Sequence, residues 1–167
     1  MSVLNILAYP SDQLKQMSAT VEQLDESLKL FIRDLEETRL AGPGAVGIAA
    51  PQVGVLQRVV IVDVSNMKKP CDNHGHMIMI NPEITDWEGM VMGREGCLSV
   101  PDFTGNVIRA ESIVLNYMDP AGDRHEITCN GFEARAIQHE IDHLDGMLFL
   151  DRLVSRRTDL FHRKIYK

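Results

Sequence analysis

The stretch GFEARAIQHEIDHLDG, residues 131–146, is the most informative part of this chain. It is typical of one helix, expected from about Phe132 to Leu144. His139 and His143 are four residues apart, so their side chains leave the same face of that helix and can bind one metal ion. Glu140 lies beside them, where its carboxylate can accept a proton from a water molecule that the metal activates. This His-Glu-x-x-His pattern (HExxH) therefore predicts a hydrolase.

The remaining chain predicts a second helix at residues 25–41, ended by Gly42-Pro43-Gly44. Short strands are expected at 58–64 and 77–84, and a hairpin at 112–119 and 124–130. A short terminal helix is expected within residues 151–167. Because the strands follow one another without alternating helices, the pattern favours an α+β fold with antiparallel β-sheets packed around the central helix that carries HExxH. Residues 1–167 are expected to form a single domain.

Composition excludes several classes of protein. The chain has 167 residues, 44% hydrophobic and 25% charged, with a net charge of −7, so nucleic acid is a poor candidate for the primary ligand. Three scattered cysteines do not make a disulfide framework. No apolar run approaches the roughly 20 residues of a membrane span, and the first residues do not resemble a targeting peptide. We therefore expect a cytoplasmic protein, although a trimmed organellar protein would look the same.

Cys97, in the stretch EGCLSVP (residues 95–101), is the candidate third ligand. A thiolate with two imidazoles suits zinc or ferrous iron and leaves a fourth position for water. Two other arrangements fail: HExxHxxGxxH would need a third histidine where Phe149 stands, and no glutamate follows Glu140 as a downstream ligand. A general metallopeptidase of the HExxH type is thus the weaker alternative. A closed structural metal site would need Cys129 or His125 as a fourth ligand.

The stretch from Cys71 through His74 to His76 could suggest a second metal cluster, but its Asn, Asp and Gly content favours a solvated loop. Cys129 ends a strand-like run and is most simply a core thiol.

Three motifs occur in one order along the chain: GAVGIAAPQVG (44–54), EGCLSVP (95–101) and QHEIDHLDG (138–146). In this combination the chain resembles the peptide deformylases, and the resemblance covers essentially all of it. It implies a metal-dependent hydrolase of protein biosynthesis that removes the formyl group from the N-terminal formyl-methionine of nascent polypeptides and releases formate. The resemblance also implies antiparallel sheets around the HExxH helix.

The resemblance further implies a role for each site residue. The metal ligands would be Cys97, His139 and His143, holding Fe²⁺ in vivo, with Zn²⁺, Ni²⁺ or Co²⁺ as replacements. Glu140 would act as acid and base. The Gln52 side chain and the Leu98 backbone N–H would stabilise the oxyanion. The peptide would lie as an added strand, with its methionine in an apolar pocket, near Val46, Gly47, Glu95, Phe132 and Arg135. Glu95 is also expected to anchor the cysteine loop through a buried polar contact.

Two departures from the family pattern concern substrate binding. Ala45 stands where the family has the first glycine of G-x-G-x-A-A, and its methyl group disfavours positive φ or crowds a bound peptide. Arg135 is charged where many relatives are apolar.

After Leu150 the only acidic residues expected to balance the basic ones are Asp151 and Asp159. The basic residues are Arg152, Arg156, Arg157, Arg163, Lys164 and Lys167. A solvated helix face is the simpler interpretation. Contact with the ribosome, as in some deformylases, is the functional alternative. A monomer is expected.

Overall fold

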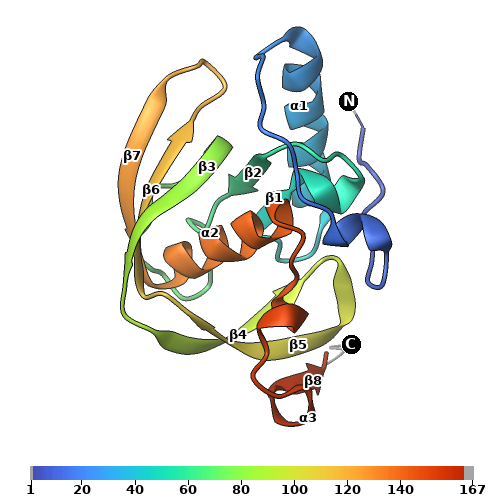
Figure 1. Ribbon diagram of the computed structural model, residues 1–167, viewed down its shortest axis with the longest axis vertical. Helices are drawn as coiled ribbons and strands as arrows, with labels where there is room; N and C mark the ends of the chain where they lie inside the picture. Colours follow the sequence, from blue (N-terminus) through green and yellow to red (C-terminus); the bar gives the residue numbers. More distant parts are fainter. Residues whose placement is uncertain (1, 164–167) are drawn as a thin grey trace.

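The computed structural model describes residues 2–163 and has an α+β fold with two antiparallel sheets (Figure 1). The larger sheet has the order β1-β2-β3-β6-β7, with bounds Gly47–Ala49, Val59–Val62, Met77–Glu88, Ser112–Met118 and Arg124–Asn130. The smaller sheet has the order β4-β5-β8, with bounds Val91–Cys97, Val100–Arg109 and Leu160–His162. The predicted fold class, α+β with antiparallel sheets, is confirmed.

Both helices expected before residue 150 are present: α1 spans Glu26–Ala41 and α2 spans Gly131–Leu144. The Asp25 side chain caps α1 by accepting a hydrogen bond from the Leu28 backbone N–H at 2.9 Å. Three short 3₁₀ helices, η1 (Asp12–Lys15), η2 (Ala50–Val53) and η3 (Phe149–Arg152), join the other elements.

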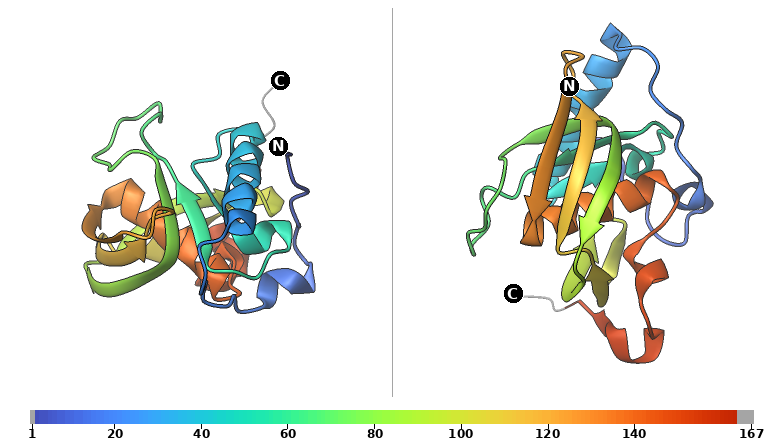
Figure 2. Two further views of the ribbon diagram at one scale, coloured as in Figure 1. Left: turned by 90° about the horizontal axis from the view of Figure 1, so that it is seen from above. Right: turned by 60° about the vertical axis from the view of Figure 1, so that its left-hand side comes forward.

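Helix α2 is buried because its apolar residues pack into the core. Ala134, Ile137, Ile141 and Leu144 belong to one cluster with residues of β2, β3 and β6. The helix contacts β1, β2, β6 and β7 of the larger sheet. Figure 1 shows it lying against that sheet, and the second view of Figure 2 shows β3, β6 and β7 side by side on the outer face. A helix so enclosed holds its side chains in fixed directions.

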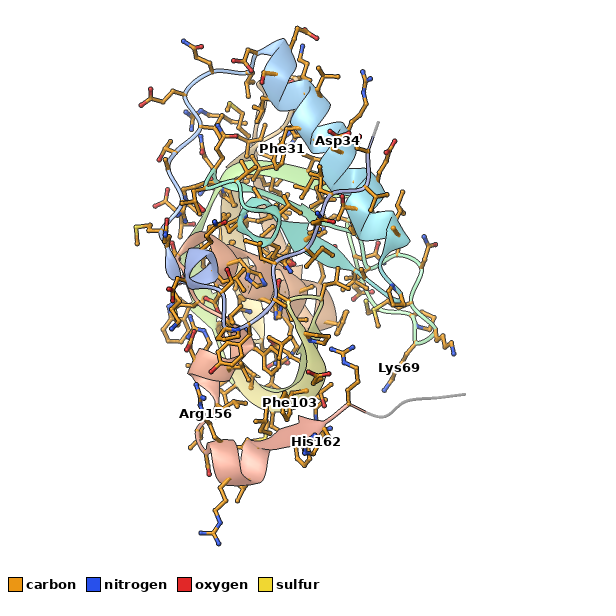
Figure 3. All side chains as sticks on the ribbon, turned by 90° about the vertical axis from the view of Figure 1, so that its right-hand side faces the viewer. Phe31, Asp34, Lys69, Phe103, Arg156 and His162 are labelled. Atoms are coloured by element: carbon orange, nitrogen blue, oxygen red, sulfur yellow. The ribbon has the colours of Figure 1, made fainter. Side chains whose placement is uncertain are left out.

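The expected short terminal helix is present only in part. Within the described residues beyond η3, the chain forms a four-residue helical turn, α3 (Arg156–Asp159), followed by strand β8, which pairs with β5. The rings of Phe103 in β5 and His162 in β8 lie at a tilt of 36°, with centroids 5.0 Å apart. Both residues are labelled in Figure 3. Pairing with an available strand edge overrides the local helical preference here.

The charges of the tail also differ from expectation. The Arg152 guanidinium donates to both oxygens of Asp142, at 2.6 and 2.8 Å, so this arginine does not face only Asp151 and Asp159. Lys164 and Lys167 lie outside the described residues.

Strands β1, β4 and β5 were not predicted, because their glycine- and proline-containing stretches lack a clear alternating pattern. Leu98 and Ser99 form the turn between β4 and β5, so the cysteine motif is a hairpin.

Within residues 2–163, no helix has the length and apolar character to cross a membrane.

Candidate metal centre

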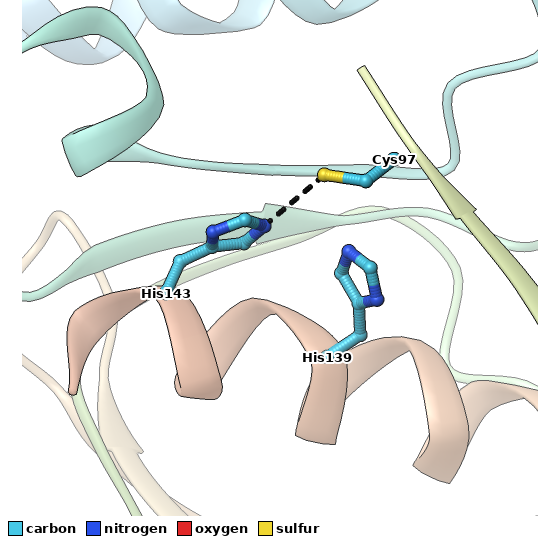
Figure 4. Close-up of side chains that lie close together, drawn as sticks. All are labelled: Cys97, His139 and His143. Carbon is cyan, nitrogen blue, oxygen red and sulfur yellow. Dashed lines mark hydrogen bonds between the residues drawn. The ribbon is translucent and has the colours of Figure 1, made fainter. Parts of the chain in front are cut away.

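Two elements bring three potential metal ligands together. Cys97 ends β4, and His139 and His143 lie one turn apart on α2. Their ligand atoms all lie within 4.8 Å of one another, and Cys97 Sγ is 3.4 Å from His143 Nε2 (Figure 4). The structure thus brings together the three residues that the motifs predicted as ligands.

The surroundings orient one imidazole and keep the other uncharged. His139 Nδ1 lies 2.9 Å from Glu95 Oε1, and because an ionised carboxylate only accepts, Nδ1 carries the proton and Nε2 is left for a ligand. His143 is 1% exposed, and burial holds its pKa well below the usual value. A neutral imidazole is the form that binds metal.

The donor set fits a divalent cation. One sulfur and two nitrogens suit zinc or ferrous iron. Burial disfavours the charged form of His139, yet hydrogen bonds to Cys97 and Glu95 raise its pKa well above the usual value. The same negatively charged surroundings that raise this pKa favour the binding of a cation.

Glu140 completes the cluster. It is 3% exposed, its Oε1 lies 3.8 Å from His143 Nε2, and burial raises its pKa to about 7. A side chain at Gly47 of β1 would conflict with it, because a Cβ built there would lie 2.7 Å from Glu140 Oε2. The carboxylate is therefore fixed between the β1 backbone and the ligand pair.

Gln52 of η2 is buried against the cysteine hairpin. Its Oε1 accepts from the Ala49 backbone N–H at 2.9 Å, which directs Nε2 toward Ser99 Oγ at 3.1 Å and Cys97 Sγ at 3.5 Å. Ser99, fully buried, was not identified from the sequence, although it lies within the EGCLSVP motif.

A pocket opens beside these groups. Its lining includes Gln52, Cys97, His139 and Glu140, together with the predicted peptide contacts, which are Val46, Gly47, Glu95, Leu98, Phe132 and Arg135. Ala45 also lines it and does not adopt a positive φ, so its methyl group causes no backbone strain.

A buried ion cluster supports the pocket wall. Glu95 receives hydrogen bonds from Arg109 at 2.8 and 2.9 Å and from Arg135 at 2.7 Å. Although burial opposes its ionisation, the bonds from Arg109 and His139 hold the Glu95 pKa well below the usual range. Arg109 also binds Asp142 of α2. The predicted anchoring contact of Glu95 is thus present, but Arg109 and Asp142 gave no signal in the sequence.

The charge of Arg135 is largely satisfied by the protein. Besides Glu95, its guanidinium donates to the carbonyls of Val91 at 2.7 Å and Val107 at 2.9 Å.

The candidates for a closed metal site lie elsewhere. His125 pairs with Asp119 at 2.6 Å, and Cys129 lies near His74 and Glu133. Neither residue belongs to the Cys97 group. That group therefore has three potential protein ligands among the described residues.

Comparison with known proteins shows the family of the chain. The model of the polypeptide deformylase family matches residues 3–159. A peptide deformylase of Thermodesulfovibrio yellowstonii is 42% identical over 164 residues, which cover 98% of this chain and 97% of the relative.

Solved structures of the same family superpose on this fold. A peptide deformylase from Ehrlichia chaffeensis in complex with actinonin has a TM-score of 0.87 and 37% identity, covering 94% of this chain and 92% of that one. A peptide deformylase from Thermotoga maritima has a TM-score of 0.83 and 34% identity, covering 92% and 99%. Because family model, relative and structures all match along nearly the whole chain, this chain belongs to the polypeptide deformylase family.

Proposed function

We propose that this chain is a metal-dependent hydrolase that removes the formyl group from the N-terminal formyl-methionine of nascent polypeptides and releases formate. Members of its family remove the N-terminal formyl group and are metalloenzymes. The observation that carries the proposal is the convergence of Cys97, His139 and His143 beside the Glu140 carboxylate, at a pocket that Cys97, His139 and Glu140 line. The whole of residues 1–167 is proposed as a single catalytic domain, with α2 and its HExxH motif as the central element.

Cys97, His139 and His143 would hold one divalent cation. Fe²⁺ is the proposed ion in vivo, and Zn²⁺, Ni²⁺ and Co²⁺ are replacements that the same sulfur and nitrogen donors accept. When bound, such an ion lowers the pKa of a coordinated water to about 7.

Glu140 would accept the proton of the attacking water and donate it to the departing amine. A buried carboxyl group whose pKa is raised to about 7 exchanges protons readily at neutral pH. Its place between Gly47 and His143 supports this role.

The Gln52 amide and the Leu98 backbone N–H would stabilise the oxyanion that forms on the formyl carbon. Gln52 Nε2 points toward Cys97 Sγ and so toward the reacting centre. Removing one such donor is expected to cost about 2.7–4 kcal/mol in the activation barrier.

The peptide would add as a strand beside β1. β1 is the end strand of the larger sheet, so within the described residues only one of its edges is paired. Val46, Gly47 and Phe132 would contact the methionine end. Because Glu95 and Arg135 satisfy one another, we assign them to the support of the pocket wall rather than to charge recognition.

Three wider assignments rest on the resemblance and on the tail. The protein would be a cytoplasmic monomer that acts on nascent polypeptides during their synthesis. Contact with the ribosome would involve Arg156 and Arg157, both exposed on α3. Co-sedimentation with ribosomes should fall in an R156E/R157E variant, and unchanged co-sedimentation would remove this contact from the account.

Formate release from a formyl-methionyl peptide tests the proposed activity. The metal-loaded chain should release formate from the formylated peptide and leave the unformylated peptide intact. Cleavage of the unformylated peptide would indicate the alternative, a general metallopeptidase, and bound metal without either reaction would refute catalysis.

A further inference from the structure

A second group of metal-binding side chains lies outside the pocket. It consists of His74 in the loop before β3, Cys129 at the end of β7 and Glu133 in the first turn of α2. We propose that these three residues form a separate Zn²⁺ site, which is independent of the deformylase activity and joins the 71–76 loop to the start of α2.

The distances between the ligand atoms are close to those around a tetrahedral zinc ion. Cys129 Sγ lies 3.8 Å from His74 Nδ1. Sulfur and nitrogen ligands of a tetrahedral zinc ion, bound at about 2.3 and 2.0–2.1 Å, lie about 3.6 Å apart. His74 Nδ1 and Glu133 Oε1, at 2.6 Å, share a hydrogen bond and would separate to about 3.3 Å around an ion. Each of these two separations would therefore change by less than about 1 Å on binding.

Glu133 is already positioned as a ligand. Its side chain is 1% exposed, and its Oε2 accepts from the His74 backbone N–H at 2.6 Å, which leaves Oε1 for the ion. The N-terminal turn of a helix stabilises a negative charge at this position. The described partners of this buried carboxylate are a half-exposed loop histidine and the Cys129 thiol, and a cation bound between them would neutralise its negative charge.

Cys129 and His74 supply sulfur and nitrogen donors, and the site is open to solvent on the His74 side. Cys129 is 1% exposed, whereas the His74 side chain is 41% exposed, so an ion enters from the loop side. Burial and the Glu133 charge raise the pKa of the Cys129 thiol to about 12, and a thiol that binds a metal ion is deprotonated. On binding, the His74 proton moves from Nδ1 to Nε2 and the thiol proton leaves to solvent. One proton is thus released for each ion bound.

The expected consequence is local order at the helix that carries HExxH. The ion would connect a strand end, a helix start and a surface loop through one shared centre, in addition to the contacts that His74 already makes with Glu133 and Cys129. This donor set is distinct from Cys97, His139 and His143, so the two sites can be counted separately.

Zinc stoichiometry tests the site. The full chain, dialysed to equilibrium against micromolar free Zn²⁺, should hold two ions, and His74→Ala should hold one. His76→Ala is the matched control, because His76 is equally exposed on the same loop but pairs with Glu36, and it should hold two. One ion in the unaltered chain, or two in His74→Ala, would overturn the proposal.

A spectroscopic measurement covers the case in which His74→Ala disturbs the loop. In a Cys97→Ser background, added Co²⁺ should produce a thiolate-to-cobalt charge-transfer band from Cys129. Adding Cys129→Ser should abolish that band. Its absence in the Cys97→Ser protein, or its persistence without Cys129, would contradict the assignment.

Discussion

The position of the Glu140 carboxylate depends on a neighbouring residue that has no side chain. Gly47 lies directly against its carboxylate, so a glycine that the motif associated with the substrate edge also sets the position of the proposed acid and base. Gly47 is thus proposed both to border the bound peptide at the β1 edge and to position Glu140.

Gly47→Ala should therefore lower kcat while leaving the metal content unchanged. The new methyl group would displace the Glu140 carboxylate by about 1 Å, a misplacement that costs about 100-fold in rate. Ala45→Gly, two residues earlier, is the control and should alter KM rather than kcat. Steady-state formate release measures both, and an unchanged kcat in Gly47→Ala would contradict the packing argument.

Glu140→Gln keeps the shape of the side chain and removes its proton-accepting group. Metal content should stay at the unaltered level, and kcat should fall by about 10²–10⁴-fold, the usual contribution of general acid–base catalysis. Turnover near the unaltered rate would assign the proton transfer to another group.

At the scale of elements, one arginine connects two strands and a helix. Arg109 of β5 binds Glu95 of β4 and Asp142 of α2, and it is 3% exposed. The small sheet, which carries Cys97, is thereby held to the helix that carries the two histidines. The alignment of the ligands depends on this buried ion cluster.

Arg109→Leu should lower the free energy of unfolding by about 3–5 kcal/mol, because it removes the buried guanidinium that the Glu95 and Asp142 carboxylates share. Arg124→Leu, at an exposed position of β7, should change it by no more than about 0.5 kcal/mol. Urea denaturation measures both values, and similar effects of the two substitutions would exclude a special role for the cluster.

The elements also show what the sequence can predict. Helix α2 and the β6–β7 hairpin are encoded by local periodicity and turn residues, so both were predicted closely. Strand β8 was missed because it forms only against the edge of β5, a partner some 55 residues earlier. Arg109 and Glu133 were missed for a related reason, because only the folded chain shows which charges are buried.

At the scale of the whole molecule, an ion in the candidate metal centre would crosslink two layers. Cys97 belongs to the smaller sheet and the histidines belong to the helix packed on the larger one. An ion that binds only the folded arrangement stabilises the entire fold.

Removing the metal should therefore lower the unfolding midpoint of the chain. In a His74→Ala background, which lacks the proposed second site, an ion at 100 times its Kd should contribute about 2.7 kcal/mol, and chelation should remove that contribution. Cys97→Ser in the same background should respond little to added metal. An equal response with and without Cys97 would place the stabilising ion elsewhere.

Anomalous diffraction at the metal absorption edge, from crystals of the loaded protein, tests the central claim most directly. The account predicts a peak bonded to Cys97 Sγ, His139 Nε2 and His143 Nε2, with its remaining coordination position open to the pocket. A peak away from these three atoms, or a fourth protein ligand in the open position, would contradict it.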